Sequence, residues 1–230
     1  MNVPPFIPQP IEIPGNVSEE ARPVCLAFVR RAVTFHFLSV VCILGVAILP
    51  IPVLPLEFVG PWILGVLLLL SLVRGLAKGR PVEFWVSVGI APALLIVVGL
   101  AARALWEAGW PVWAPGAGLF FSLVYSWVSG RDHSFVGQYV LSLIASSIFI
   151  AIVQQTVQEV SAHPATALLG NGAFLFYFVY DLAAILTRRR KGEEVAAVVD
   201  LYRDVLNGAT YTVRVWRHWQ KHKIWSVPAR

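Results

Sequence analysis

Residues 136–153 read VGQYVLSLIASSIFIAIV, a run that contains no charged side chain. Such a run is typical of a transmembrane helix, because about 20 apolar residues are needed to cross the hydrocarbon core of a bilayer. Comparable apolar runs occur at residues 32–49, 58–76, 84–102, 114–128 and 165–186. The sequence therefore predicts a chain that crosses a membrane several times.

The composition of the whole chain supports this interpretation. Of its 230 residues, 57% are hydrophobic and only 13% are charged, against about 25% charged residues in an ordinary soluble domain. So little charge excludes a disordered chain, a nucleic-acid-binding domain and a typical soluble enzyme. We expect an all-α, polytopic membrane helix bundle with about seven transmembrane helices, whose main partner is the lipid bilayer and which binds no nucleic acid.

The loops between the apolar runs alternate in charge. Lysine and arginine concentrate in loops that remain on the cytoplasmic side of a membrane. The loops and flanks that are rich in these residues carry Arg22, Arg30, Arg31, Arg74, Lys78, Arg80, Arg131, Arg188, Arg189, Arg190 and Lys191. This pattern predicts an integral, multi-pass protein of a bacterial plasma membrane with a cytoplasmic N-terminus.

The last candidate segment, residues 195–216, is less apolar than the others. Its polar side chains Asp200, Asp204 and Asn207 follow the i, i+4, i+7 spacing of one helix face. Because polar residues inside a membrane usually face the interior of a bundle, this pattern predicts a central last helix. The basic tail that follows leaves two alternatives open: the segment crosses the membrane, which its length favours, or it enters and returns.

The sixth run contributes one acid, Asp181, on the other side of the hairpin turn expected around Gly192. Asp181 and Asp204 are almost equidistant from that glycine, so an antiparallel helix pair would place them at a similar depth. Two neighbouring carboxylates in a low-dielectric environment do not both ionise easily and tend to share a proton. The alternative is that Asp181 simply pairs with one of the arginines at 188–190.

Several short motifs resemble the Bax inhibitor-1 (TMBIM) family of seven-helix membrane proteins. The sequence YDL at 180–182 and the sequence AAVVDLYRDVLN at 196–207 are similar to the motifs on that family's last two helices. The stretch FVRRAV at 28–33 is similar to the family's entry into its first helix. The loop SGRDHSFVG at 129–137 is similar to the loop after its fourth helix.

The resemblance implies a pH-sensitive calcium leak across the membrane. The family's paired gating aspartates would fall on Asp181 and Asp204, and the basic residue that pairs with them would fall on Arg74. Arg203 is a second candidate counter-charge, next to Asp204, while Asp200 and Asn207 complete the polar stripe. We expect helices 6 and 7 to part when the dyad loses its shared proton, with protons or Ca²⁺ as the small partners and no bound cofactor.

Two other functions fit the same sequence. The first is a non-conducting subunit or adaptor of a larger membrane complex that docks through its tails, and the second is a solute carrier. We assign residues 1–27 to a proline-rich N-terminal tail, 28–216 to the membrane domain and 217–230 to a basic C-terminal tail. The sequence contains no catalytic or metal-binding motif, so it does not predict an enzyme or a metal site.

Overall fold

The computed structural model describes residues 13–49, 55–77, 80, 82–157 and 164–202. All its regular structure in these ranges is helical. The long helices are α1 (Arg22–Ala47), α2 (Leu56–Ala77), α3 (Glu83–Glu107), α4 (Ala114–Val128), α5 (Phe135–Thr156) and α6 (Pro164–Ile185). Two short 3-10 turns, η1 (Val17–Glu19) and η2 (Gly130–Asp132), precede α1 and α5. Residues 194–202 are also helical.

The helices coincide with the apolar runs over most of their length, and their length and composition are those of a multi-pass membrane protein. Within the described ranges, five helices are long and apolar enough to cross a membrane. The sixth long helix, α4, is shorter than these five. Its 15 residues span about 22 Å at 1.5 Å per residue, which is less than the roughly 30 Å thickness of the hydrocarbon core. Prolines 61 and 92 lie inside α2 and α3, as membrane bundles tolerate.

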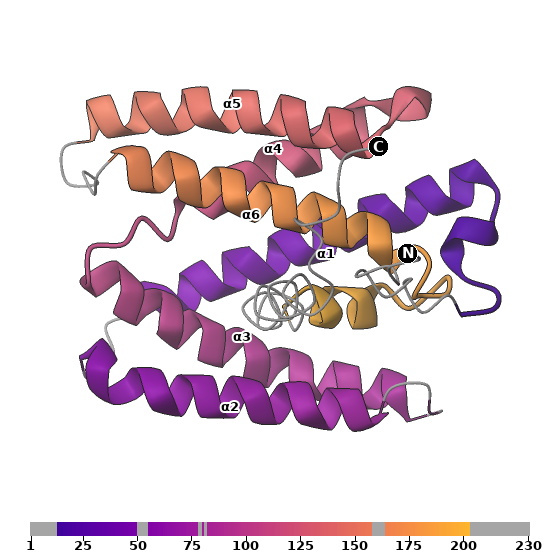
Figure 1. The fold of residues 1–230 in the computed structure, drawn as a ribbon, viewed down its shortest axis with the longest axis horizontal. Coiled ribbons are helices and arrows are strands. Elements are labelled where there is room, and N and C mark those ends of the chain that lie inside the picture. The colour runs from indigo at the N-terminus through magenta and orange to yellow at the C-terminus, as the bar shows by residue number, and fades with distance from the viewer. Residues whose placement is uncertain (1–12, 50–54, 78–79, 81, 158–163, 203–230) are drawn as a thin grey trace, which may run out of the picture.

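Successive long helices run in opposite directions. At the right-hand side of Figure 1, α1, α3 and α5 begin and α2, α4 and α6 end. We call this side the basic end, because it carries most of the arginines described below. The first helix begins at Arg22, ten residues before the apolar run. Pro23 in its first turn favours a helix start, because the N–H that proline lacks would have no partner within the helix at that position.

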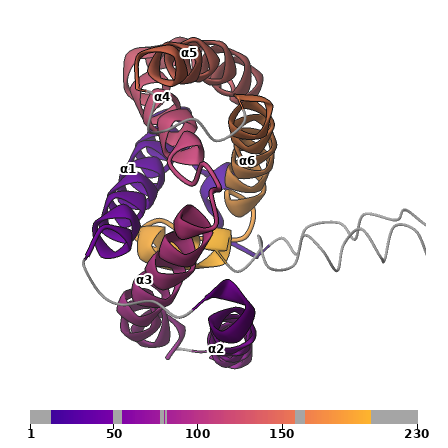
Figure 2. The same cartoon turned by 90° about the vertical axis from the view of Figure 1, so that its left-hand side faces the viewer.

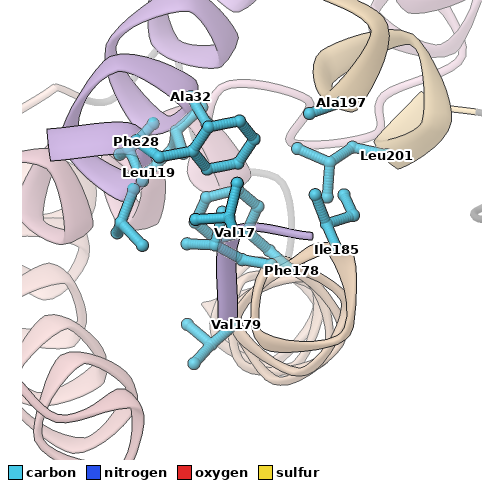
Figure 3. Close-up of a cluster of buried hydrophobic side chains, with 12 residues drawn as sticks. Val17, Phe28, Ala32, Leu119, Phe178, Val179, Ile185, Ala197 and Leu201 are labelled. Carbon is cyan, nitrogen blue, oxygen red and sulfur yellow. The ribbon is translucent and has the colours of Figure 1, made fainter. Parts of the chain in front are cut away.

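The main core lies between α1, α4, α6 and the helical residues 194–202. Figure 3 shows Phe28 of α1 and Phe178 of α6 beside Leu201 and Val17, and all four side chains are buried. The main chain around Val17 is held to the turn after α6: the Val17 N–H donates to the Arg189 carbonyl at 2.9 Å, and the Ser18 N–H to the Leu186 carbonyl at 3.1 Å. The N-terminal segment therefore closes one side of this core.

The helical residues 194–202 lie between two groups of helices, α1 and α6 on one side and α2 and α3 on the other. Figure 2 shows them flanked by α1, α3 and α6. Ala197 and Leu201 pack in the core with α1 and α6, while Val199 packs with α2 and α3 through Leu67 and Leu94. The predicted site residues Arg203, Asp204 and Asn207 lie outside the described residues.

The contact between α1 and α3 depends on the absence of a side chain at Gly99. A Cβ atom at this position would lie 2.6 Å from Cβ of Val46. We expect Gly99→Ala to lower the free energy of unfolding by about 1–3 kcal/mol, as overpacked core substitutions do. Thermal denaturation in mild detergent checks this. Gly89→Ala on the same helix is the control, because nothing lies within 4 Å of its added Cβ; equal melting temperatures of the two variants would contradict the prediction.

Candidate functional site: a buried ion-pair network

Four charged side chains form a network at the basic end of the bundle. Arg74 Nη2 lies 2.7 Å from Glu83 Oε1 and 3.5 Å from Asp200 Oδ1. Arg189 donates through Nε to Asp200 Oδ2 at 2.8 Å, and its Nη1 and Nη2 groups contact Glu83 and Asp200. The network therefore joins four segments of the chain through two arginines and two carboxylates.

The fold places three members of the network at helix ends or in a turn, and the fourth inside a helix. Arg74 lies in the last turn of α2 and Glu83 is the first residue of α3, so one short hairpin presents both. Arg189 lies in the turn between α6 and the helical residues 194–202, and Asp200 lies within the latter. Gly192 allows this tight reversal with φ of 90°, a conformation that favours glycine.

Three of the four charges in the network are almost completely removed from solvent, while the Glu83 side chain is 15% exposed. The exposed fractions of Arg74, Arg189 and Asp200 are 1%, 2% and 3%. Burial by itself would lower the pKa of Arg189, but Asp200 and Glu83 hold that pKa above its ordinary value. The two positive and two negative side chains compensate one another, which is what allows buried charges to persist.

Asp181, the predicted gating residue of the sixth helix, is buried near the C-terminal end of α6. Its Oδ1 atom lies 3.7 Å from Nη1 of Arg188. This is the contact expected if Asp181 pairs with an arginine of the following turn. Its predicted partner Asp204 lies outside the described residues, so the distance between the two carboxylates is not part of the structure.

Arg74, the predicted counter-charge, faces a carboxylate of the last helical segment. That carboxylate belongs to Asp200, which the sequence placed in the polar stripe around the dyad. Arg74 therefore lies close to acids from two helices, Glu83 and Asp200.

Glu83 and Arg189 were not predicted from the sequence as partners of Arg74 and Asp200. Glu83 begins a helix, where an acid is favoured by the helix dipole alone, and this local explanation hides its role in the network. Arg189 is the middle of three consecutive arginines, of which it is buried while Arg190 is exposed. The sequence pattern does not indicate which of these three arginines is buried, because that depends on the conformation of the turn after α6.

A second ion pair flanks the network. The side chain of Arg31 in α1 bonds to Oε1 of Glu194 at 2.8 Å, and Glu194 is the first of the helical residues 194–202. This pair connects the start of that segment to α1, while Asp200 connects it to Arg74 of α2 and to Arg189. The segment is thus held at the basic end by charges as well as by apolar packing.

The solvent space beside the network is small. A hollow of about 10 Å³ adjoins Arg74 and is lined by Ser71, Leu94 and Val199 among others. This volume is at the lower limit of what one water molecule needs. A larger apolar hollow of about 130 Å³ lies between α1, α3 and the segment 194–202, where the Ser39 and Tyr202 hydroxyls bond at 2.6 Å.

The described part of the chain brings together no group of three or more histidine, cysteine, aspartate or glutamate side chains that could hold a metal ion. Cys25 and Cys42 are free thiols. The chain matches no protein-family model, no curated protein and no solved structure.

Proposed function

We propose that this chain is a cation-permeable membrane protein of the Bax inhibitor-1 type, with a proton-sensitive latch at the basic end of its bundle. In this proposal the membrane domain has seven helices with the last one central, and it lies in a bacterial plasma membrane with its N-terminus in the cytoplasm. The observation that supports it most is the buried network of Arg74, Glu83, Arg189 and Asp200. Charges are expensive inside a membrane protein, so they are commonly associated with ion pathways.

The two parts of the latch have different roles in this proposal. The network anchors the segment 194–202 to the α2–α3 hairpin, while Asp181 and Asp204 act as the proton-sensitive pair. When the dyad loses its shared proton, the two carboxylates repel each other and helices 6 and 7 part. Ca²⁺ is the proposed permeant ion, because it binds carboxylate oxygens readily.

Calcium flux into liposomes tests this function. With a calcium-sensitive dye inside the vesicles, we expect the flux through the wild-type protein to rise with pH. Asp181→Asn and Asp204→Asn each remove a titrating carboxylate and are expected to flatten that profile. Asp132→Asn is the matched control, since Asp132 is exposed in η2; wild-type flux and pH profile in both dyad variants would exclude the latch.

One observation favours a second function, that of a non-conducting subunit or adaptor. Both arginines and both acids of the network are paired within the chain, and the hollow next to Arg74 is only about 10 Å³. An adaptor needs such a closed, rigid end and no ion path. Absence of flux at every pH, together with a membrane protein that co-purifies through residues 1–27 or 217–230, would support this second function over the first.

A further inference from the structure

The arginines at the basic end fall into two groups according to their partners. Arg31, Arg74, Arg188 and Arg189 each lie within ion-pair distance of a carboxylate. Arg30, next to Arg31 in α1, forms no ion pair with an acid in the described ranges of the chain. The same holds for Arg22, at the start of that helix. These last two side chains therefore carry positive charge that the described part of the protein does not neutralise.

Arg30 is held in a fixed position between α1 and α4, which pack against each other (Figure 2). Its Nε group donates to the Ser126 carbonyl at 2.9 Å, and its guanidinium lies 5.5 Å from the ring centroid of Trp127. The Trp127 indole N–H donates to the Thr34 hydroxyl at 3.3 Å. The guanidinium is thus oriented by a carbonyl and an aromatic ring, and neither removes its charge.

Arg22 extends the same positive region toward the loop between α4 and α5. Its Nη2 group donates to the Arg131 carbonyl at 2.6 Å and to the His133 carbonyl at 3.3 Å. Burial lowers the pKa of His133; a hydrogen bond with Gln138 opposes this shift, and the nearby charges of Arg30 and Arg22 add to it. Both arginines therefore lie close enough to this histidine to repel its protonated form. The neighbouring acid Asp132 is exposed and forms no ion pair with either arginine.

The surface beside these arginines is apolar. Trp127 is 56% exposed, and the α4 residues Val124 and Val128 are exposed next to it. Because α4 ends here, the positive groups lie at the level where a membrane helix passes from hydrocarbon into the headgroup layer, and tryptophan is enriched at that level. A positive group above an exposed apolar strip matches a lipid, whose phosphate lies above its acyl chains.

We propose that the surface formed by α1 and α4 at the basic end, around Arg30, Arg22 and Trp127, binds the headgroup of an anionic phospholipid. Arg30 and Arg22 contact the phosphate, with Trp127 beneath Arg30 and the acyl chains along the exposed face of α4. Arginine suits this role because its planar guanidinium donates two parallel hydrogen bonds to a phosphate. The site is separate from the network of Arg74, Glu83, Arg189 and Asp200, so it does not depend on the proposed function.

Lipid titration of the purified full-length protein tests the site. Bound lipid is counted by native mass spectrometry while the protein, in mild detergent, is titrated with phosphatidylglycerol or with phosphatidylcholine. We expect the wild-type protein to bind phosphatidylglycerol at least fivefold more tightly, and Arg30→Gln and Arg22→Gln each to weaken that binding about fivefold, since a basic residue contributes about that factor toward anionic lipid. Arg30→Lys, which keeps the charge and loses the planar fork, is expected to retain part of the affinity.

Arg190→Gln separates this site from general attraction to the basic end. Arg190 is exposed at the same end and bonds only weakly, through Nε, to the Pro14 carbonyl at 3.3 Å. An equal loss in Arg190→Gln and Arg30→Gln would overturn the proposal, as would equal affinity for the two lipids. Inorganic phosphate at millimolar concentration is expected not to displace the lipid; full displacement would assign the site to a free anion.

Discussion

Replacing Arg189 by methionine is expected to lower the free energy of unfolding by about 3–5 kcal/mol, the cost of removing one partner from a buried ion pair. The substitution preserves much of the side-chain volume but leaves Glu83 and Asp200 to share Arg74. One of these two acids, of which Asp200 is buried, would then lack a full counter-charge. We expect a clear fall in the midpoint of thermal denaturation in mild detergent, measured by tryptophan fluorescence.

Two further variants identify the ion pair as the cause. Lys191 lies two residues after Arg189 and is exposed. We expect Lys191→Gln, which removes its positive charge, to change the midpoint of denaturation little. The double variant Arg189→Met, Asp200→Leu removes both members of one buried ion pair, so it should cost less than the sum of the two single changes. Strict additivity, or an equal effect of Lys191→Gln, would show that the network is not what stabilises this end.

Gly118→Ala in α4 is expected to cost about 2–4 kcal/mol, the sum of overpacking and a disturbed buried hydrogen bond. A Cβ atom at this position would collide with Oδ1 of Asn171 and lie 2.9 Å from Cγ of Leu175. Asn171 is fully buried and donates to the Ser146 hydroxyl at 2.8 Å. The amide must move to admit the methyl group, and it then loses its partner on α5.

Gly116→Ala is the matched control in the same helix. Its added Cβ would meet Leu44 Cδ1 at 3.7 Å, an ordinary van der Waals distance. Because alanine also has the higher helix propensity, this control should be neutral or slightly stabilising. Equal melting temperatures for Gly116→Ala and Gly118→Ala would show that close packing between α4 and α6 does not require a small residue.

The helices themselves were largely predictable from the sequence. The run at 136–153 lies within α5, the run at 114–128 coincides with α4, and the run at 84–102 lies within α3. Their hydropathy is a local property: in a membrane each segment must satisfy its own backbone hydrogen bonds, so an apolar run of sufficient length becomes a helix whatever its neighbours are. The helix ends differ from the predicted ones, as at Arg22, where α1 begins ten residues before the predicted apolar run.

The same reasoning found part of the charged site. Asp181, Asp200 and Arg74 stood out because charges are rare within apolar runs, and all three are buried. The contacts of Arg74 with Glu83 and of Asp200 with Arg189 did not follow from spacing. The described contact of Asp181 is with Arg188, which is the simpler of the two alternatives for this residue, and Asp204 lies outside the described residues.

The sequence by itself determined the class of the protein, the positions of its apolar helices and the few charges that lie among them. The tertiary structure alone decided that Glu83 and Arg189 complete the network, and that Arg30 lies on Trp127 without an acidic partner among the described residues. The physical reason is the range of the two effects. Hydropathy is a property of each helix and can be read along the chain. The pairing of charges joins residues that are far apart in the sequence, such as Glu83 and Arg189, and only the packing of the bundle brings them together in space.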